Sequence, residues 1–123
     1  MEALTGLDVE GKALLLFTGW SDYWGDERYF RHPCVPRGMA ERRQAMHMHP
    51  VLVGIDTLVT DSTRDPTRPA HTRLLRSGIL IVENLTGLAR LIGEAFVFVA
   101  APVKAAGAAA FPVRAFAVLG MAA

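Results

Sequence analysis

Short runs of consecutive apolar residues recur along the chain and predict β-strands. Two of them, residues 11–19 (GKALLLFTG) and 51–55 (VLVGI), lack the alternation of a half-exposed strand. Such runs are typical of strands that are covered on both faces in a mostly parallel sheet. A third run, residues 79–83 (ILIVE), ends at a glutamate. We therefore expect three buried strands in the first two thirds of the chain.

Helical patterns lie between and after these runs. Residues 38–48 (GMAERRQAMHM) predict a helix that ends before Pro50, because the residue before a proline is disfavoured in the helical region. Residues 71–78 (HTRLLRSG) predict a two-turn helix with Gly78 as its left-handed cap. Residues 84–94 (NLTGLARLIGE) indicate a further helix. Polar stretches are expected to form two loops, residues 20–33 and 60–70.

The last third of the chain predicts two more strands. Residues 95–103 (AFVFVAAPV) and 111–119 (FPVRAFAVL) flank a turn of small residues, 104–110 (KAAGAAA). Strands that alternate with helices indicate an α/β fold. The chain shows no internal repeat and no internal boundary, so we expect residues 1–123 to form a single domain.

Composition and charge exclude several classes of protein. Thirteen basic and twelve acidic residues leave a formal charge of +1, which gives no footprint for nucleic acid or for an anionic membrane. The single cysteine, Cys34, excludes an internal disulfide framework and fits a reducing compartment. The most apolar stretch, residues 96–113, is interrupted by two prolines and a lysine and does not suit a membrane span. We expect a cytoplasmic protein without a targeting segment.

His71 and Glu83 are the candidate metal ligands. The helix from His71 rises about 10 Å before the turn at Gly78, and the strand that follows returns about 16 Å to Glu83. The two residues can therefore meet at the sheet edge where ligands bind in open α/β folds. An imidazole and a carboxylate together suit zinc or a similar ion, which polarises carbonyls and acidifies bound water. From spacing alone, a plain structural pair remains the alternative.

The surroundings expected for this pair also favour a partner for each residue. His71 shares a helix face with Leu74 and Leu75 and is expected to point inward. A carboxylate at the end of a buried strand must be paired or bind a metal. His47 and His49 are further possible ligands, with a solvated helix end as the alternative.

Three other groups of residues have both a functional and a structural interpretation. Trp20 and Trp24 can line an aromatic substrate pocket, with Trp20 as the predicted substrate-binding residue, or can pack against a strand end. Asp56 is a candidate catalytic carboxylate or a turn cap. Arg64 and Arg68 can hold a substrate carboxylate or be solvated.

Four longer segments carry a resemblance to a known family. They are LLLFTGWSDYW (14–24), LVGIDTLVTDS (52–62), HTRLLRSGILIVENLTGL (71–88) and FVAAPVKAAGAAAFPVRAFAVL (98–119). In this order they resemble the C-terminal part of the cyclase family, the metal-dependent hydrolases that include bacterial kynurenine formamidase. The resemblance runs over residues 11–119.

The resemblance implies a swivelling β/β/α fold, usually dimeric, with one or two divalent metals, commonly zinc. It implies the activity of an arylformamidase, which hydrolyses N-formylkynurenine to kynurenine and formate in tryptophan catabolism. On the matching positions, His71 binds one metal and Glu83 binds or bridges metals. The other ligands of the family lie in a motif, HxGTHxDxPxH, that this chain does not contain. The chain thus resembles a partial member, an incomplete cyclase-like domain.

Two interpretations of the function follow, and the sequence leaves both open. The first is a metal-dependent amide hydrolase of which this chain carries the C-terminal half of the site. A catalytic zinc usually has three protein ligands, so the activity of this chain alone is an open question. The second is a non-catalytic cyclase-like domain that associates with a separate N-terminal half or with its own copy. A truncated product without a role of its own is a third possibility.

Overall fold

The computed structural model describes residues 8–35 and 49–121. The chain divides into two compact units, Met1–Leu88 and Ala89–Ala123. The helix predicted at residues 38–48 lies outside the described residues. No helix in the described part has both the length and the apolar character needed to cross a membrane.

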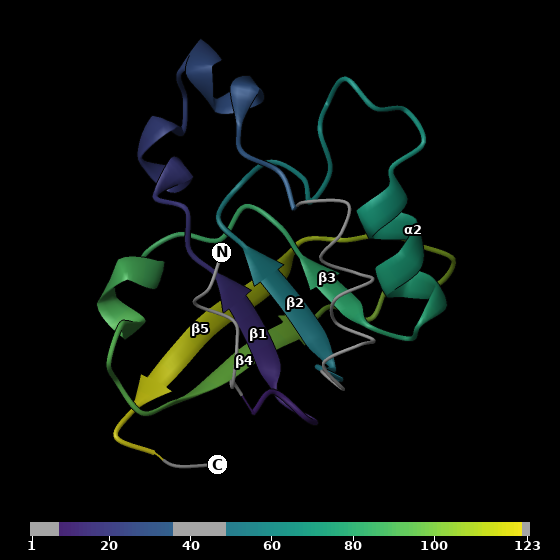
Figure 1. Cartoon of the computed structure of the whole chain (residues 1–123). Coiled ribbons are helices and arrows are strands. Elements are labelled where there is room, and N and C mark those ends of the chain that lie inside the picture. The colour runs from purple at the N-terminus through teal and green to yellow at the C-terminus, as the bar shows by residue number, and fades with distance from the viewer. Residues whose placement is uncertain (1–7, 36–48, 122–123) are drawn as a thin grey trace. The chain divides into compact units, whose positions relative to one another are not determined.

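The first unit contains a three-stranded parallel sheet (Figure 1). Its strands are β1 (Ala13–Leu16), β2 (Leu52–Ile55) and β3 (Leu80–Val82), in the order β1-β2-β3. Each lies within one of the apolar runs, so all three predicted strands are confirmed. Because the strands are parallel, their carboxyl ends meet at one edge of the sheet.

The prediction that all three strands are buried is correct only for β2. Every residue of β2 is buried, whereas β1 is half-buried and Leu80 in β3 is 63% exposed. The physical reason is position, since β2 has a neighbouring strand on each side and β3 has one on one side only. Gly54 in β2 permits close packing: a Cβ there would lie 2.6 Å from Leu15 Cδ2 and 2.7 Å from Leu85 Cδ1.

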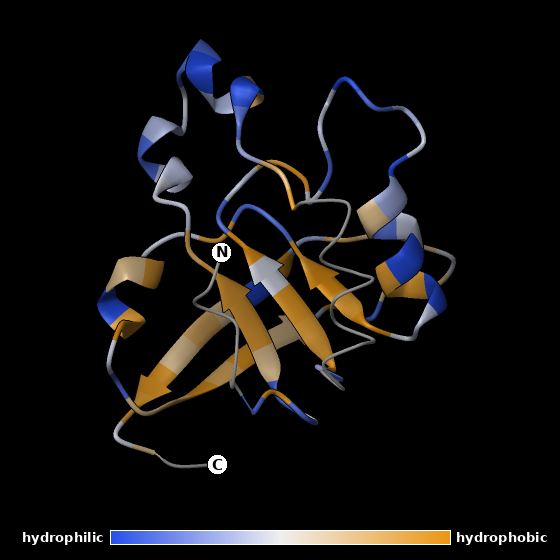
Figure 2. Ribbon diagram, viewed as in Figure 1, coloured by the Kyte–Doolittle hydropathy of each residue, from blue (hydrophilic) through white to orange (hydrophobic). Residues whose placement is uncertain are grey.

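The helix α2 (Pro69–Arg76) confirms the two-turn helix expected from the sequence, although it begins two residues earlier. Gly78 has a φ of +73° and ends the helix as predicted. Leu74 is buried in a core cluster with Val53 and Ile79. In Figure 2, the strands of the sheet are mostly apolar and α2 alternates between polar and apolar colours, as expected for a helix with one buried side.

Residues 20–33, expected to be a loop, and residues 84–94, expected to be a helix, both contain short 3₁₀ helices. Within residues 20–33 these are η2 (Trp20–Tyr23) and η3 (Glu27–Arg31). In place of the helix at 84–94 there is only η4 (Leu88–Leu91). Gly87 and Gly93, which flank it, both have a positive φ, and this backbone conformation does not continue an α-helix.

The second unit is an antiparallel ribbon of β4 (Phe96–Pro102) and β5 (Val113–Leu119), which confirms the two strands predicted there. Its register pairs Phe96 with Leu119 and Pro102 with Val113. Both strands are predominantly apolar (Figure 2). Sheet and helix elements together confirm a mixed α/β fold class, while the swivelling arrangement and the single domain stay predictions.

Candidate functional site

Asp56 follows β2 at the carboxyl edge of the sheet and ties the chain that leaves β1 to this edge. Its side chain is fully buried. The carboxylate accepts hydrogen bonds from Thr18 N (3.0 Å), Thr18 Oγ1 (2.7 Å) and Gly19 N (2.8 Å). Because the protein's own donors occupy its oxygens, the geometry favours the cap that the sequence offered as an alternative to a catalytic carboxylate.

His71 and Glu83 are brought together at the same edge. His71 Nδ1 lies 3.7 Å from Glu83 Oε1, and their side chains are 25% and 22% exposed. Glu83 comes directly after β3, and its Oε1 accepts a hydrogen bond from Thr60 N (3.1 Å). The helix face of His71 is less buried than expected, since Leu75 is 49% exposed. The pair therefore lies at the boundary between core and solvent, accessible to a ligand.

Asp61 positions His71 and was not recognised from the sequence. Its carboxylate, 3% exposed, accepts hydrogen bonds from Ala70 N (2.7 Å) and His71 N (2.8 Å). These bonds satisfy two N–H groups at the start of α2, which explains why the helix begins before His71. Thr60 and Asp61 are adjacent, so one loop orients both members of the pair. Asp61 lies nine and ten residues before the residues whose N–H groups it binds, and this separation is not a capping pattern that a sequence shows.

Arg68 contacts the pair as well. One of its guanidinium nitrogens, Nη2, lies 3.0 Å from His71 Nδ1. A guanidinium can only donate, so Nδ1 accepts this hydrogen bond, and the ring N–H of the neutral imidazole is on Nε2. The sequence offered Arg64 and Arg68 together as candidates. The structure places Arg68 beside His71 and leaves Arg64 exposed in the preceding loop.

Trp20 and Trp24 have different surroundings. Trp20 Nε1 donates to the backbone oxygen of Tyr29 (3.1 Å), and its ring packs against Tyr23. Trp24 packs edge to face against the Tyr29 ring, with ring centroids 5.2 Å apart. A cavity of about 250 Å³ has the following lining residues: Ser21, Trp24, Tyr29, Asn84, Leu85 and Thr86. Trp24 rather than Trp20 lines this cavity, and substrate binding by Trp20 stays a prediction.

Tyr29 connects this cavity to the buried edge of the sheet. It is 4% exposed, and its hydroxyl donates to Asn84 Oδ1 (2.8 Å). Burial raises the pKa of the Tyr29 hydroxyl above its ordinary value of 10.0, and the negative charge of Asp56 adds to this rise. The folded protein therefore keeps the phenolic proton at a pH at which the unfolded chain releases it.

Tyr29 is expected to make the protein sensitive to alkali. Its contribution to the free energy of unfolding is complete below the ordinary tyrosine pKa and is lost as the pH rises through the raised pKa. Urea unfolding at about pH 9 and about pH 11 measures how much unfolding free energy is lost between these two pH values. This loss should be smaller for Tyr29→Phe than for the wild type. Tyr23→Phe, which keeps Tyr29, should retain the wild-type loss. An equal loss in Tyr29→Phe and the wild type would contradict this prediction.

The two other histidines in the described part of the chain, His32 and His49, do not extend the pair. His32 is buried: its Nδ1 lies 2.8 Å from the backbone oxygen of Pro33, and its Nε2 has no hydrogen-bond partner in the described part of the chain. His49 is exposed, and His47 lies outside the described residues. Over residues 8–35 and 49–121, no three His, Cys, Asp or Glu side chains form a group that could hold a metal ion. The candidate site described by the structure thus consists of two ligands.

The geometry of this pair is compatible with one shared ion. Two metal bonds of about 2.1 Å each can connect atoms up to about 4.2 Å apart. The separation of 3.7 Å between His71 Nδ1 and Glu83 Oε1 is within this limit. The lone pair on Nδ1 and the carboxylate oxygen are donors that zinc accepts.

Comparisons with known proteins found similarity to one curated protein and to one solved structure, among others. No protein-family model matches the chain. Over 108 residues the chain is 35% identical to the uncharacterized protein MJ0783 of Methanocaldococcus jannaschii. This match covers 86% of this chain and 53% of that protein. A solved structure, described as a potential metal-dependent hydrolase with cyclase activity, is 28% identical with a TM-score of 0.68. That similarity covers 92% of this chain and 53% of the other.

The chain therefore spans about half the length of the curated relative and of the solved structure that it matches. The structural similarity covers 92% of this chain. It is a similarity in fold and sequence to a cyclase-like hydrolase, and it supports the cyclase-like family expected from the sequence.

Proposed function

We propose that this chain contributes His71 and Glu83 to the metal site of a cyclase-like, metal-dependent hydrolase. The observation that carries this proposal is the approach of His71 Nδ1 to Glu83 Oε1 at the carboxyl edge of the sheet. The structure described as a potential metal-dependent hydrolase with cyclase activity supports the reaction class. We infer that this pair by itself binds the ion in this chain. Since the chain spans about half of that structure, a further ligand that completes a catalytic site would come from the other half of the fold.

The proposed metal is zinc, which would polarise a substrate carbonyl and acidify water when bound. The residues of this chain position the two ligands. Thr60 N–H holds Glu83 Oε1, and the Asp61 carboxylate holds the backbone of His71. Partial burial of both ligand side chains reduces competition from water.

The proposed substrate is an aryl formamide such as N-formylkynurenine, cleaved to an aromatic amine and formate. The four sequence segments similar to the cyclase family support this substrate class. The rings of Trp24 and Tyr29 line the cavity, and a flat aromatic group of a substrate can pack against such rings. The same proposal places the reaction in tryptophan catabolism in the cytoplasm.

Metal content per chain tests the proposed site. The wild type, loaded with zinc and desalted, is expected to retain zinc in plasma mass spectrometry, while Glu83→Ala and His71→Ala should lose most of it. Each substitution leaves a single ligand, which holds an ion weakly. Glu94→Ala, which removes an exposed glutamate of the second unit, is the matched control and should retain zinc. Zinc retained by Glu83→Ala, or absent from the wild type, would contradict the proposal.

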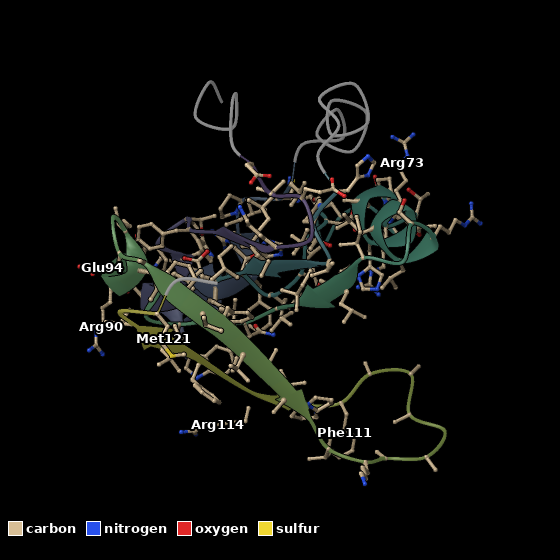
Figure 3. All side chains as sticks on the ribbon, turned by 90° about the horizontal axis from the view of Figure 1, so that it is seen from below. Arg73, Arg90, Glu94, Phe111, Arg114 and Met121 are labelled. Atoms are coloured by element: carbon tan, nitrogen blue, oxygen red, sulfur yellow. The ribbon has the colours of Figure 1, made fainter. Side chains whose placement is uncertain are left out.

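The second candidate function is association without catalysis, and exposed apolar side chains favour it. On β5 and beside it, Phe111 is 56%, Phe116 44%, Leu119 48% and Met121 52% exposed. Figure 3 labels Phe111 and Met121 of this group. Large exposed apolar groups of this kind mark interaction sites. We infer that the partner is a second copy of this chain, which would form a dimer.

Self-association is expected in sedimentation velocity at micromolar concentration. Phe116→Ser should shift the protein toward the monomer, because it removes apolar area from the proposed interface. Phe30→Ser is the matched control, since Phe30 is an equally large residue, 60% exposed, in the first unit. A wild-type protein that sediments as a monomer would exclude this candidate.

A further inference from the structure

Arg68 directly precedes α2, and its side chain reaches the proposed metal site. Its Nη2 lies 3.0 Å from His71 Nδ1, the atom that also lies 3.7 Å from Glu83 Oε1. The backbone of Arg68 has a φ of +44°, which non-glycine residues rarely adopt. Its side chain does not cap the helix, because the Asp61 carboxylate serves the first N–H groups of α2. The backbone oxygen of Arg68 accepts a hydrogen bond from Thr72 N (3.0 Å), but the position of its side chain is not explained by the helix.

The contact between Arg68 and His71 uses the lone pair that a metal would need. A guanidinium donates hydrogen bonds and accepts none, so it binds Nδ1 through the nitrogen lone pair. A metal ion also binds a neutral imidazole through the lone pair of a ring nitrogen. One lone pair serves only one of the two partners. A divalent ion and a guanidinium at this distance would also repel each other.

We propose that Arg68 competes with the metal ion for His71 Nδ1 and is displaced when the ion binds. This inference rests on the proposed function. It assigns Arg68 the opposite effect to His71 and Glu83: these two residues bind the metal, and Arg68 weakens its binding. Arg68 is exposed and belongs to the loop before α2, so its side chain can leave without disturbing the core. After displacement, its charge remains beside the site, where it suits a substrate that carries a carboxylate.

Zinc affinity measured on the full chain by competition with a chromophoric chelator tests this inference. Arg68→Met keeps the length of the side chain and removes its charge and donors. It is expected to bind zinc about tenfold more tightly than the wild type, because a charge-assisted hydrogen bond no longer has to break. Arg64→Met, the matched control in the same loop, should bind zinc as the wild type does.

The possible outcomes separate this inference from the proposed function. If the wild type binds zinc and Arg68→Met binds it equally or more weakly, Arg68 is not a competitor, while the metal site stands. If neither the wild type nor the two variants bind zinc, the proposed function is wrong and the inference is wrong with it. If Arg68→Met binds zinc more tightly than the wild type and Arg64→Met does not, both the inference and the proposed function are supported.

A measurement without metal provides a second test. Long-range proton–nitrogen correlation spectra of the metal-free protein at neutral pH should show the His71 ring proton on Nε2 and a bare Nδ1. In Arg68→Met, the Nδ1 shift should change because its hydrogen-bond donor is gone. A proton on Nδ1 in the wild type would overturn the inference whatever the zinc affinities are.

Discussion

Replacing Asp56 with asparagine is expected to lower the free energy of unfolding of the first unit by about 3 kcal/mol. The Asp56 side chain is fully buried, and both of its oxygens accept hydrogen bonds from Thr18 and Gly19. Asparagine has nearly the same shape, but one oxygen becomes an NH₂ group that can only donate. Buried donors would then face a donor, and at least one of them would lose its partner without access to water.

Urea unfolding followed by tryptophan fluorescence measures this loss. Both tryptophans of the chain, Trp20 and Trp24, belong to the first unit, so the signal reports on the part of the chain that Asp56 ties together. Asp22→Asn, which changes an exposed aspartate of η2 in the same way, should unfold at the wild-type midpoint. An unchanged midpoint for Asp56→Asn would mean that its hydrogen bonds contribute little to stability.

The strands could be predicted because a strand is a local element, and a short run of apolar residues is enough to indicate it. The same pattern could not distinguish β2 from β3, because a run of apolar residues does not tell which strand is central. Leu52 is buried and Leu80, its partner in the register, is 63% exposed. The apolar spacing of residues 84–94 predicts a helix, whereas the structure has only the short η4, because the positive φ of Gly87 and Gly93 interrupts the helix on both sides.

The proximity of His71 and Glu83 could be predicted for a related reason. A short helix, a turn and a short strand connect them, and the dimensions of these elements bring both ends to one edge. Arg68 and Asp61 could not be assigned in this way. Their roles depend on where an irregular loop returns to the start of α2, and loop geometry has no regular period in the sequence. The metal role of His71 and Glu83 itself stays a prediction.

Asp61→Ala is expected to cost about 2 kcal/mol of unfolding free energy and to weaken zinc binding as well. Without the carboxylate, the N–H groups of Ala70 and His71 lose the acceptor that holds them at 2.7 and 2.8 Å. The first turn of α2 would then fray, and His71 would no longer be held facing Glu83. The expected effect on zinc is a weaker affinity, opposite in sign to that of Arg68→Met.

This opposition makes the Asp61 substitution informative about the site as well as the fold. Stability is measured by urea unfolding, and zinc affinity by the same chelator competition under conditions in which the variant is folded. Asp22→Ala controls for the loss of an exposed aspartate and should change neither quantity. If Asp61→Ala lost stability but kept its zinc affinity, α2 would not need its cap to position His71. The ligand would then be held by its own packing between Glu83 and the core.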